Sequence, residues 1–345
     1  MSEYELQFIE PDGQDWNTFI GQRPDSNIFH HPAWHQLLGK CYGYRPFAMV
    51  MRDPDGSIRA GLPFMEVNRP HRKRRWISLP FSDHCSPLTN EPEVLARLST
   101  SLNTLSGEHG NPNIEVRWDL SGTPSEQDCM DYVLHVLSLD QDVEKVKSRI
   151  HHSHLRNVKA AQAHEIQIRR GVSERDLEAF YRLHLETRHR QGVPIQPRRY
   201  FKLLHEMILQ PGLGFISLAY HGSECLAGAV FLHWNRTLTY KYGASTEAGL
   251  SLRPNHLIFW DAIRWGCEQG YSVLDFGRTD LENSGLRIFK SRWGAREIPL
   301  RYFNTPQPDP ANGERAFMSA AQAVISRSPL WLCKLAGEIY YRFFA

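Results

Sequence analysis

The order of hydrophobic runs along this chain is repeated once, and the repeat restricts the fold more than any other feature. In the first half, two helical segments precede three strand-like runs, "RPFAMVMR", "IRAGLPFMEV" and "RRWISLPFS". In the second half, two helical segments precede "GFISLAYH", "CLAGAVFLHW" and "TLTYKYGAS". A helix and a further strand follow each triplet, and the length of 345 residues suits two domains. The pattern predicts an α+β fold of two similar domains with a cleft between them, where a ligand can bind.

The boundary between the expected domains lies where apolar strands give way to a basic helix. We expect an N-terminal domain at residues 1–141, a C-terminal domain at 142–310 that begins with this helix, and a helical tail at 311–345. The basic helix is expected at about 142–163. The strands "NIEVRW" and "DYVLHVLSL" precede it, and this division assigns both to the first domain.

The tail ends in the apolar segment "SPLWLCKLAGEIYYRFFA". Its charges Lys334, Glu338 and Arg342 are spaced i, i+4, i+8 and share one helical stripe. We expect a helix docked on the protein's own surface, with contact to a membrane surface or a partner as the alternative. The sequence shows neither a secretory signal nor an apolar run of about 18 residues. A cytoplasmic protein is therefore expected, with the inner face of the membrane as the alternative location.

Composition narrows the classes of partner. The formal net charge is only +2, so an anionic partner must be met by local patches rather than by bulk charge. The 6 cysteines lie far apart without a Cys-x-x-Cys pair, which favours free buried thiols in a reducing compartment. The 17 histidines include no His-Glu-x-x-His motif, so no metal site is expected.

The tripeptide Asp275-Phe276-Gly277 is the one that carries magnesium in protein kinases. The glycine-rich loop, the Val-Ala-Ile-Lys strand and the His-Arg-Asp loop of a kinase are all missing. The Walker A, G-x-G-x-x-G and G-x-S-x-G motifs are missing too. We therefore interpret the tripeptide as the end of a strand.

The second meander, followed by a capped helix and a strand, resembles the GNAT acyltransferase fold. In that fold a glycine-containing loop after the meander presents backbone N–H groups to the pyrophosphate of acetyl-CoA. Here Arg253 is followed by Pro254, Asn255 and His256 where the glycines would stand. Because proline donates no N–H and side chains block close approach to the backbone, a standard CoA clamp is not expected.

Five stretches of the sequence carry a more specific resemblance. They are "FHHPAWHQLLGKCYGYRPF", "SLPFSDHCSPLT", "SRIHHSHLRNVKAAQ", "AFYRLHLETRHRQGVPIQPRRYF" and "VLDFGRTDLENSGLRIFKSRWGA", and together they resemble the FemAB-like proteins, a branch of the GNAT superfamily. The resemblance implies a tandem pair of GNAT-like domains. It also implies an acyl- or aminoacyltransferase that acts on a cell-envelope, peptidoglycan or exopolysaccharide precursor. The acceptor would be a small molecule or a lipid-linked saccharide or peptide.

The donor stays open between acyl-CoA and aminoacyl-tRNA, and no bound cofactor is expected. Some relatives in the peptidoglycan branch carry a long antiparallel helical arm in the second domain, and this chain has none. The sequence therefore does not establish aminoacyl-tRNA as the donor.

Two residues are candidates for catalysis. Lys290 matches the lysine of the family's Phe-Lys-x-x-aromatic-Gly motif, which implies stabilisation of an oxyanion or of a donor phosphate. The alternative is a surface lysine on an exposed helical face. Asp83 follows the first meander, where relatives have an aspartate near the acceptor, so it is a candidate base or acceptor-orienting group, with turn capping as the alternative. His84 is a second candidate base.

The remaining candidates bind substrate. Arg278 and Asp280 follow the Asp-Phe-Gly strand end, and Arg278 is expected to bind phosphate or carboxylate, with pairing to Asp280 or Glu282 as the alternative. Phe289 is expected to anchor its helix together with Trp293.

Further candidates lie on the basic helix, on the third strand of the second meander and in a basic run. Arg156, with Asn157 and Lys159, either meets an anionic substrate or lies on a solvated helix face. Tyr242 and Tyr240 are expected on one face of their strand, where they line the cleft or fill the core. The run at 69–75 is a solvated hairpin or binds a lipid phosphate. A rival to the enzyme is a non-catalytic GNAT-like module that binds a glycolipid or a protein partner.

Overall fold

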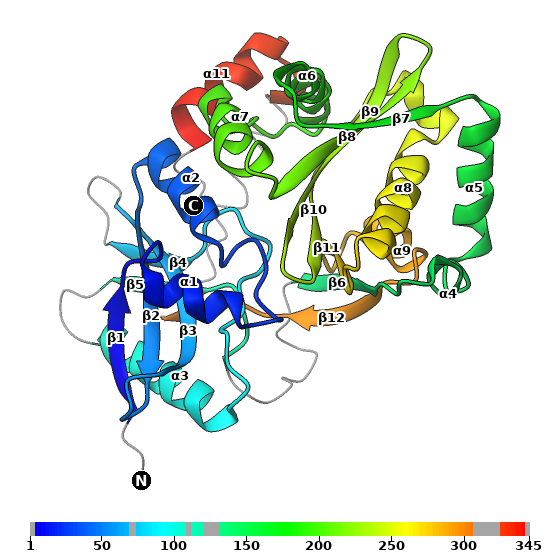
Figure 1. Cartoon of the computed structure of the whole chain (residues 1–345). Coiled ribbons are helices and arrows are strands. Elements are labelled where there is room, and N and C mark those ends of the chain that lie inside the picture. Colours follow the sequence, from blue (N-terminus) through cyan, green and yellow to red (C-terminus); the bar gives the residue numbers. More distant parts are fainter. Residues whose placement is uncertain (1–3, 69–73, 108–111, 121–131, 306–324, 342–345) are drawn as a thin grey trace.

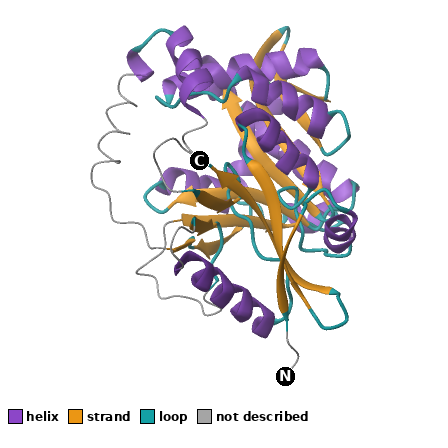
Figure 2. Ribbon diagram, turned by 90° about the vertical axis from the view of Figure 1, so that its left-hand side faces the viewer, coloured by secondary structure: helices purple, strands orange, loops and turns teal. Residues whose placement is uncertain are grey.

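The computed structural model describes residues 4–68, 74–107, 112–120, 132–305 and 325–341, and its strands form two sheets with helices around them (Figure 1). A view turned by 90° shows the helices outside the strands from a second direction (Figure 2). The first sheet has six strands in the order β1-β2-β3-β4-β5-β13, which are β1 (Glu5–Ile9), β2 (Arg45–Arg52), β3 (Ile58–Val67), β4 (Arg75–Ser78), β5 (Asn113–Val116) and β13 (Phe303–Thr305).

The second sheet has seven strands in the order β12-β6-β11-β10-β9-β8-β7. They are β6 (Tyr132–Ser138), β7 (Gln167–Gly171), β8 (Gly214–His221), β9 (Glu224–Trp234), β10 (Thr237–Ser245), β11 (Val273–Asp280) and β12 (Arg296–Leu300). The α-helices are α1 (Gln14–Gly21), α2 (Pro32–Tyr42), α3 (Pro92–Gly107), α4 (Val143–Lys147), α5 (His152–Ala163), α6 (Glu174–Arg190), α7 (Arg198–Leu204), α8 (Pro254–Glu268), α9 (Ser284–Ser291) and α11 (Leu330–Tyr340). A π-helical turn (His205–Leu209) extends α7, and a 3₁₀ turn (Ala248–Leu252) precedes α8.

The two sheets repeat one arrangement, as the sequence pattern predicts. In each sheet, four strands pair antiparallel in chain order, and a helix then leads to a fifth strand that pairs parallel with the fourth. The helix is α3 in the first sheet and α8 in the second, and the parallel pairs are β4–β5 and β10–β11. The α+β fold with two GNAT-like halves is therefore confirmed.

Two strands cross the boundary expected between residues 141 and 142. Strand β6, assigned from sequence to the first domain, is hydrogen-bonded between β11 and β12 of the second sheet. Strand β13 lies late in the chain and pairs with β5 of the first sheet. Strand pairing joins segments that are distant in sequence, so the change from apolar strands to a basic helix does not mark where one sheet ends.

Local chemistry explains where several helices begin and end. The Ser173 side chain accepts a hydrogen bond from the Asp176 N–H, and Asp176 accepts one from the Ser173 N–H, which forms a capping box before α6. The single basic helix expected at 142–163 is two helices, α4 and α5. The chain breaks between them because His151 caps α5, accepting a hydrogen bond from the Ser153 N–H.

The hydrophobic core holds the two halves together. One cluster of buried side chains runs from the first sheet through α2 to α6 and α7 of the second half, and it includes Trp34, Phe64 and Tyr200. A second cluster lies on the opposite face of the second sheet under α8, with Phe259 and Trp293 among its members. Both faces of the second sheet are therefore covered.

The C-terminal helix α11 docks beside α6 (Figure 1). A Cβ added to Gly337 would lie 1.9 Å from the carbonyl oxygen of Ile195, so only glycine permits this approach. Glu338 accepts a hydrogen bond from the Arg198 N–H (2.8 Å), so this member of the expected charged stripe contacts the protein itself. Arg342 lies outside the described residues. No helix in the described ranges is long and apolar enough to cross a membrane.

Candidate active site

Charged and aromatic side chains from both halves meet between the two sheets. They come from the loop after β4, the end of β5, strands β10 and β11, helix α9 and the residue before β13. We call them the inter-domain cluster, which consists of Asp83, His84, Arg117, Lys241, Asp275, Arg278, Lys290 and Tyr302.

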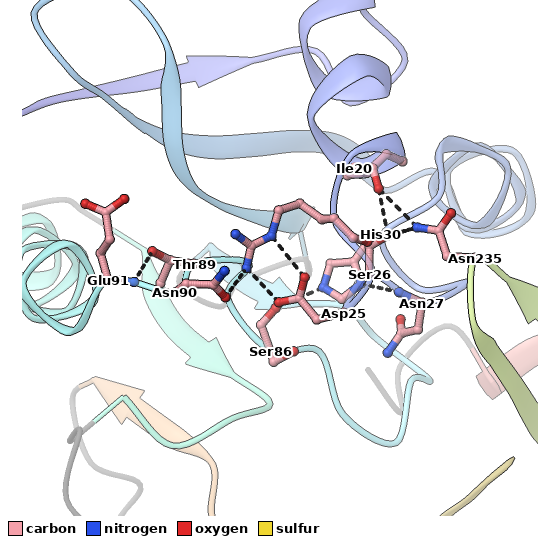
Figure 3. Close-up of polar contacts among 11 residues, drawn as sticks. Ile20, Asp25, Ser26, Asn27, His30, Ser86, Thr89, Asn90, Glu91 and Asn235 are labelled. Carbon is pink, nitrogen blue, oxygen red and sulfur yellow. Dashed lines mark hydrogen bonds and ion pairs between the residues drawn. The ribbon is translucent and has the colours of Figure 1, made fainter. Parts of the chain in front are cut away.

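A buried histidine, His30, holds the loop that carries Asp83 and His84 through a hydrogen bond. The His30 ring meets the Ser86 carbonyl oxygen at 2.9 Å and accepts a hydrogen bond from the Asn27 N–H at 3.1 Å (Figure 3). Burial lowers the pKa of His30 to about 4, so its ring is neutral and Nε2 carries the proton given to Ser86. In the same view, Asn235 from the turn between β9 and β10 donates to the carbonyl oxygen of Ile20 at 3.1 Å, which ties the second half to this region.

Gly277 allows the first-half loop to touch β11. Its φ is +71°, and a Cβ added there would lie 2.6 Å from Oδ2 of Asp83. The pairing of β11 with β6 is irregular between Asp275 and Arg278, and the strand then continues to Asp280. The Asp-Phe-Gly tripeptide is therefore a bulge within a strand, and our interpretation of it as a strand end is wrong. A left-handed glycine can interrupt a strand without ending it.

Asp275 forms a buried ion pair with His84, at 2.8 Å between Oδ2 and Nε2. Its other oxygen accepts a hydrogen bond from the Gly277 N–H at 2.7 Å. Burial opposes the charged form of Asp275, but His84 and this N–H hold the pKa of the carboxyl below its usual value. Burial likewise lowers the pKa of His84, yet Asp275 and Asp83 outweigh it and raise that pKa. The sequence analysis assigned no role to Asp275, since its partner lies 191 positions away.

Lys290 is buried, with 4% of its surface exposed. Its amine donates to the carbonyl oxygens of Gly277 and Arg278, each at 3.0 Å. Burial lowers the pKa of Lys290 to about 8, against the opposing effect of Asp83, Asp275 and Asp280. The alternative of a surface lysine is therefore wrong. Two of the three N–H donors of the amine are used by these carbonyl oxygens.

Arg278 links the two halves through a tyrosine. Its Nη1 donates to the Tyr302 hydroxyl, which in turn donates to the Asp83 carbonyl oxygen, both at 2.6 Å. The guanidinium lies over the Tyr132 ring, 4.2 Å from its centre. The alternative expected from sequence is an ion pair of Arg278 with Asp280 or Glu282. The contacts of Arg278 described above include neither residue. Asp280 is exposed at the end of β11.

Lys241 completes the cluster, and sequence reasoning missed it. Its amine donates to the Phe81 carbonyl oxygen at 2.5 Å and lies over the rings of Phe29, Trp34 and Tyr242. Burial lowers its pKa, although Asp83 opposes the shift. Arg117 donates to the Ser82 carbonyl oxygen and pairs with Glu115. With Asp275 paired to His84, the cations Lys241, Arg278 and Lys290 face the single carboxylate of Asp83 in this cluster. Such a balance favours an anionic ligand.

Lys241 is also the extra residue of a β-bulge. Tyr240 pairs with Phe231 and Tyr242 with Val230, so Lys241 has no partner on β9. The bulge reverses the alternation of side chains, and the two tyrosines lie on opposite faces of the sheet. Tyr240 packs on Phe259 under α8, whereas the Tyr242 hydroxyl meets that of Tyr200 at 2.8 Å. The expectation of a single aromatic face is therefore wrong, and Tyr242 borders the cluster through the Lys241 amine that lies over its ring.

The remaining predicted residues lie outside the cluster. Phe289 packs against His154, His256 and Trp293, as expected of a helix anchor. Arg156 is exposed on α5.

The basic run is only partly described, because residues 69–73 lie outside the described ranges. Arg75 pairs with Glu115 at 2.8 Å, and Arg74 lies 3.8 Å from Glu66. Among the described residues, no group of three or more His, Cys, Asp or Glu side chains is arranged to hold a metal ion. Five of the cysteines are free thiols, and Cys129 lies outside the described residues.

The N-terminus of α8 is covered rather than open. Pro254 is its first residue, and Arg253 before it is left-handed, with φ of +59°. Helix α5 lies against this end, where the Asn157 side chain meets Nε2 of His256 at 3.1 Å and the His154 ring packs on His256. This geometry supports the expectation that a pyrophosphate is not clamped here.

Comparison with known proteins finds a family match within the second half. Residues 151–291 match the model of a family described as the acetyltransferase (GNAT) domain. Lipid II:glycine glycyltransferases of Staphylococcus epidermidis and Staphylococcus aureus are 33% identical to this chain over 75 residues. The matched segment spans 20% of this chain and only 18% of the length of each relative.

Solved structures resemble nearly the whole chain. The crystal structure of FemX has a TM-score of 0.69 at 15% identity, covering 87% of this chain and 96% of FemX. The C-terminal domain of a putative lysylphosphatidylglycerol synthetase from Agrobacterium fabrum has a TM-score of 0.54 at 12% identity, covering 90% of this chain and 95% of that one. At these identities the likeness shows the fold. Residues 151–291 thus match a GNAT domain, and nearly the whole chain shares the fold of FemX, in line with the resemblance noted from the sequence.

Proposed function

We propose that this acyltransferase moves an aminoacyl or acyl group onto an amine of a cell-envelope or polysaccharide precursor, and that the inter-domain cluster is its active site. The observation that carries the proposal is the position of Lys290. Its amine is buried between the halves of a GNAT-type fold, within the electrostatic reach of Asp83. A lysine pKa of about 8 leaves the amine mostly charged at pH 7.

The reaction needs three tasks from the protein. The acceptor amine attacks the donor carbonyl carbon, a C–N bond forms, and the C–O or C–S bond to the leaving group breaks. In the proposal, the Lys290 ammonium donates to the oxyanion that develops on the carbonyl oxygen. Asp83, half-buried beside Gly277, orients the acceptor amine and takes its proton, which then passes to the leaving group. Arg278 binds a phosphate or carboxylate of the substrate.

The relatives favour one donor and one kind of acceptor. The curated relatives are named for transfer of glycine to lipid II, which supports an aminoacyl donor and a lipid-linked acceptor here. The covered N-terminus of α8 argues against acyl-CoA.

The outer face of α11 supports a working position at a membrane surface. Leu330, Trp331, Leu335 and Ile339 are exposed there, Trp331 by 63%. An amphipathic helix with an exposed tryptophan suits the interface of a lipid bilayer. In the proposal, α11 brings the protein to the inner face of the membrane that holds the acceptor.

The test compares envelope precursors and polysaccharide by mass spectrometry in a deletion strain. The strain is complemented with the wild type, with Lys290→Met, or with Lys202→Met as a control at an exposed lysine of α7. We expect the transferred group to be missing from the deletion strain and from Lys290→Met, and to be present with Lys202→Met. Because Met would leave two carbonyl oxygens unpaired, at a cost of about 1–3 kcal/mol each, protein levels are measured in parallel.

A non-catalytic module predicts a different outcome. If the protein only bound a glycolipid or a partner, Lys290→Met at normal protein level would leave the precursors as in the wild type. That result would contradict the proposed catalysis. The contacts among Lys290, Arg278, Tyr302 and Asp83 favour the enzyme, because a scaffold has no need to gather them at one place.

A further inference from the structure

The outer face of α9 carries an open cavity of about 500 Å³ that the proposed reaction does not use. Lys290 lies on the inner face of the same helix. The cavity is lined by Arg149, His151, Ser284, Arg287, Ile288, Ser291, Arg292 and Glu297. A volume of this size accommodates a small ligand.

Two guanidinium groups in this cavity form no ion pair within 4 Å among the described residues, although Asp140 acts on Arg149 electrostatically at longer range. Arg149 donates from Nη2 to the carbonyl oxygen of Ser138 at 2.7 Å, which fixes the side chain without neutralising it. Arg292 is exposed and forms no ion pair among the described contacts. Arg287 is neutralised, because it makes two hydrogen bonds to Glu297 at 3.0 and 2.8 Å. The cavity therefore keeps two positive charges.

The walls of the cavity are held in place. The His151 N–H donates to the Arg292 carbonyl oxygen at 2.8 Å, which joins the start of α5 to the end of α9. Gly294 has a φ of +83°, and a Cβ added there would lie 3.0 Å from the Arg149 carbonyl oxygen. The His151 ring also has a defined orientation, since Nδ1 accepts from the Ser153 N–H and leaves Nε2 as a donor.

We infer that this cavity is a second binding site, for a ligand that carries a phosphate or diphosphate group. Arginine, histidine and serine side chains approach from two segments of the chain, residues 149–151 and helix α9, and a guanidinium can bind a phosphate group through two parallel hydrogen bonds. The exposed Ile288 side chain offers apolar contact to the organic part of the ligand. The inference does not depend on the proposed transfer reaction.

The test is calorimetric titration of the full chain in phosphate-free, low-salt buffer. Pyrophosphate and inorganic phosphate, each titrated separately, probe the oxyanion alone, adenosine 5′-phosphate adds an organic group, and succinate is the carboxylate competitor. Arg149→Gln/Arg292→Gln removes the two unpaired charges. Arg175→Gln/Arg236→Gln is the matched control, because both of its arginines are exposed elsewhere on the second half.

We expect saturable pyrophosphate binding that Arg149→Gln/Arg292→Gln weakens by at least about tenfold, since each lost charge-assisted hydrogen bond costs more than a neutral one. The control should bind like the wild type. Tighter binding of adenosine 5′-phosphate than of inorganic phosphate would identify an organic phosphate as the ligand, and equal binding a free one. Absence of saturable binding, equal binding by the two double variants, or succinate binding as tight as pyrophosphate would overturn the inference.

A second measurement needs no variant. Pyrophosphate should protect Arg149 and Arg292 from modification by phenylglyoxal, while Arg175 and Arg236 react as before. Peptide mass spectrometry reads out each site. Equal modification of Arg149 and Arg292 with and without pyrophosphate would exclude them from the site.

Discussion

At the residue scale, a glycine and a carboxylate fix how the two halves meet. Gly277 has a backbone conformation that favours glycine, and the space of its missing Cβ holds the Asp83 carboxylate. Gly277→Ala should cost about 1–3 kcal/mol of unfolding free energy in strain alone, plus the clash with Asp83. Chemical denaturation measures this cost.

Removal of the Asp83 carboxylate separates the cost of backbone strain from the cost of the clash. Asp83→Ala combined with Gly277→Ala should recover the part of the loss that comes from the clash. Gly285→Ala on α9 is the control, because its nearest neighbour lies 4.0 Å from an added Cβ and helical Ala is favourable. Additive losses of unfolding free energy in the double variant would show that the added methyl group does not clash with the Asp83 carboxylate.

The ion pair of His84 and Asp275 should give stability a defined dependence on pH. The folded pKa of His84 lies above its unfolded value of about 6.5. Its contribution is therefore complete below pH 6.5 and is lost as pH rises through the folded pKa. We expect the difference in unfolding free energy between the wild type and His84→Gln to shrink from pH 6 to pH 8.

The other buried histidines are present in both the wild type and His84→Gln. Their effect on the unfolding free energy therefore cancels in the difference between the two proteins. His221→Gln, at an exposed turn, is the control variant. A difference that grows as pH rises would mean that His84 is held neutral in the folded protein.

At the element scale, the start of α8 leads us to predict that acyl-CoA does not bind. Pro254 removes an N–H from its first turn, and α5 covers the adjoining His256 through Asn157. Calorimetric titration with acetyl-CoA, and with a longer acyl-CoA, should show no heat beyond that of dilution. Micromolar affinity would contradict this reading of the helix end and restore acyl-CoA as the donor.

At the scale of the whole molecule, the exchange of β6 and β13 makes the two halves interdependent. Strand β12 pairs only with β6 in the described structure, and β6 also pairs with β11. Co-expressed pieces 1–141 and 142–345 should copurify, because the first piece still supplies β6 to the second sheet. Gel filtration measures the complex.

The matched pair 1–131 and 142–345 lacks β6 and should copurify much less well, because β12 loses its hydrogen bonds to β6 and the edge of β11 is exposed. Only the pairing of β5 with β13 and the shared hydrophobic core then join the two pieces. If both pairs copurified equally well, the inserted strand would not be what joins the halves.

The sequence by itself determined most of the elements and their doubled order. Alternating apolar residues and turn residues act over a few positions, so β2 and β3 could be predicted closely. Family resemblance, carried by short motifs, pointed to Lys290 and Asp83.

Only the tertiary structure decided the exchange of strands, the buried amine of Lys290, and the partners of Asp275 and Lys241. These features depend on contacts between segments far apart in the chain, such as the 191 positions between His84 and Asp275. The bulge at Lys241 likewise moves Tyr242 to the other face through its pairing with β9. Local sequence patterns predict the geometry of a single helix or strand. Strand pairing and burial depend on which elements meet in the folded protein, and the spacing of residues along the chain does not show which elements those are.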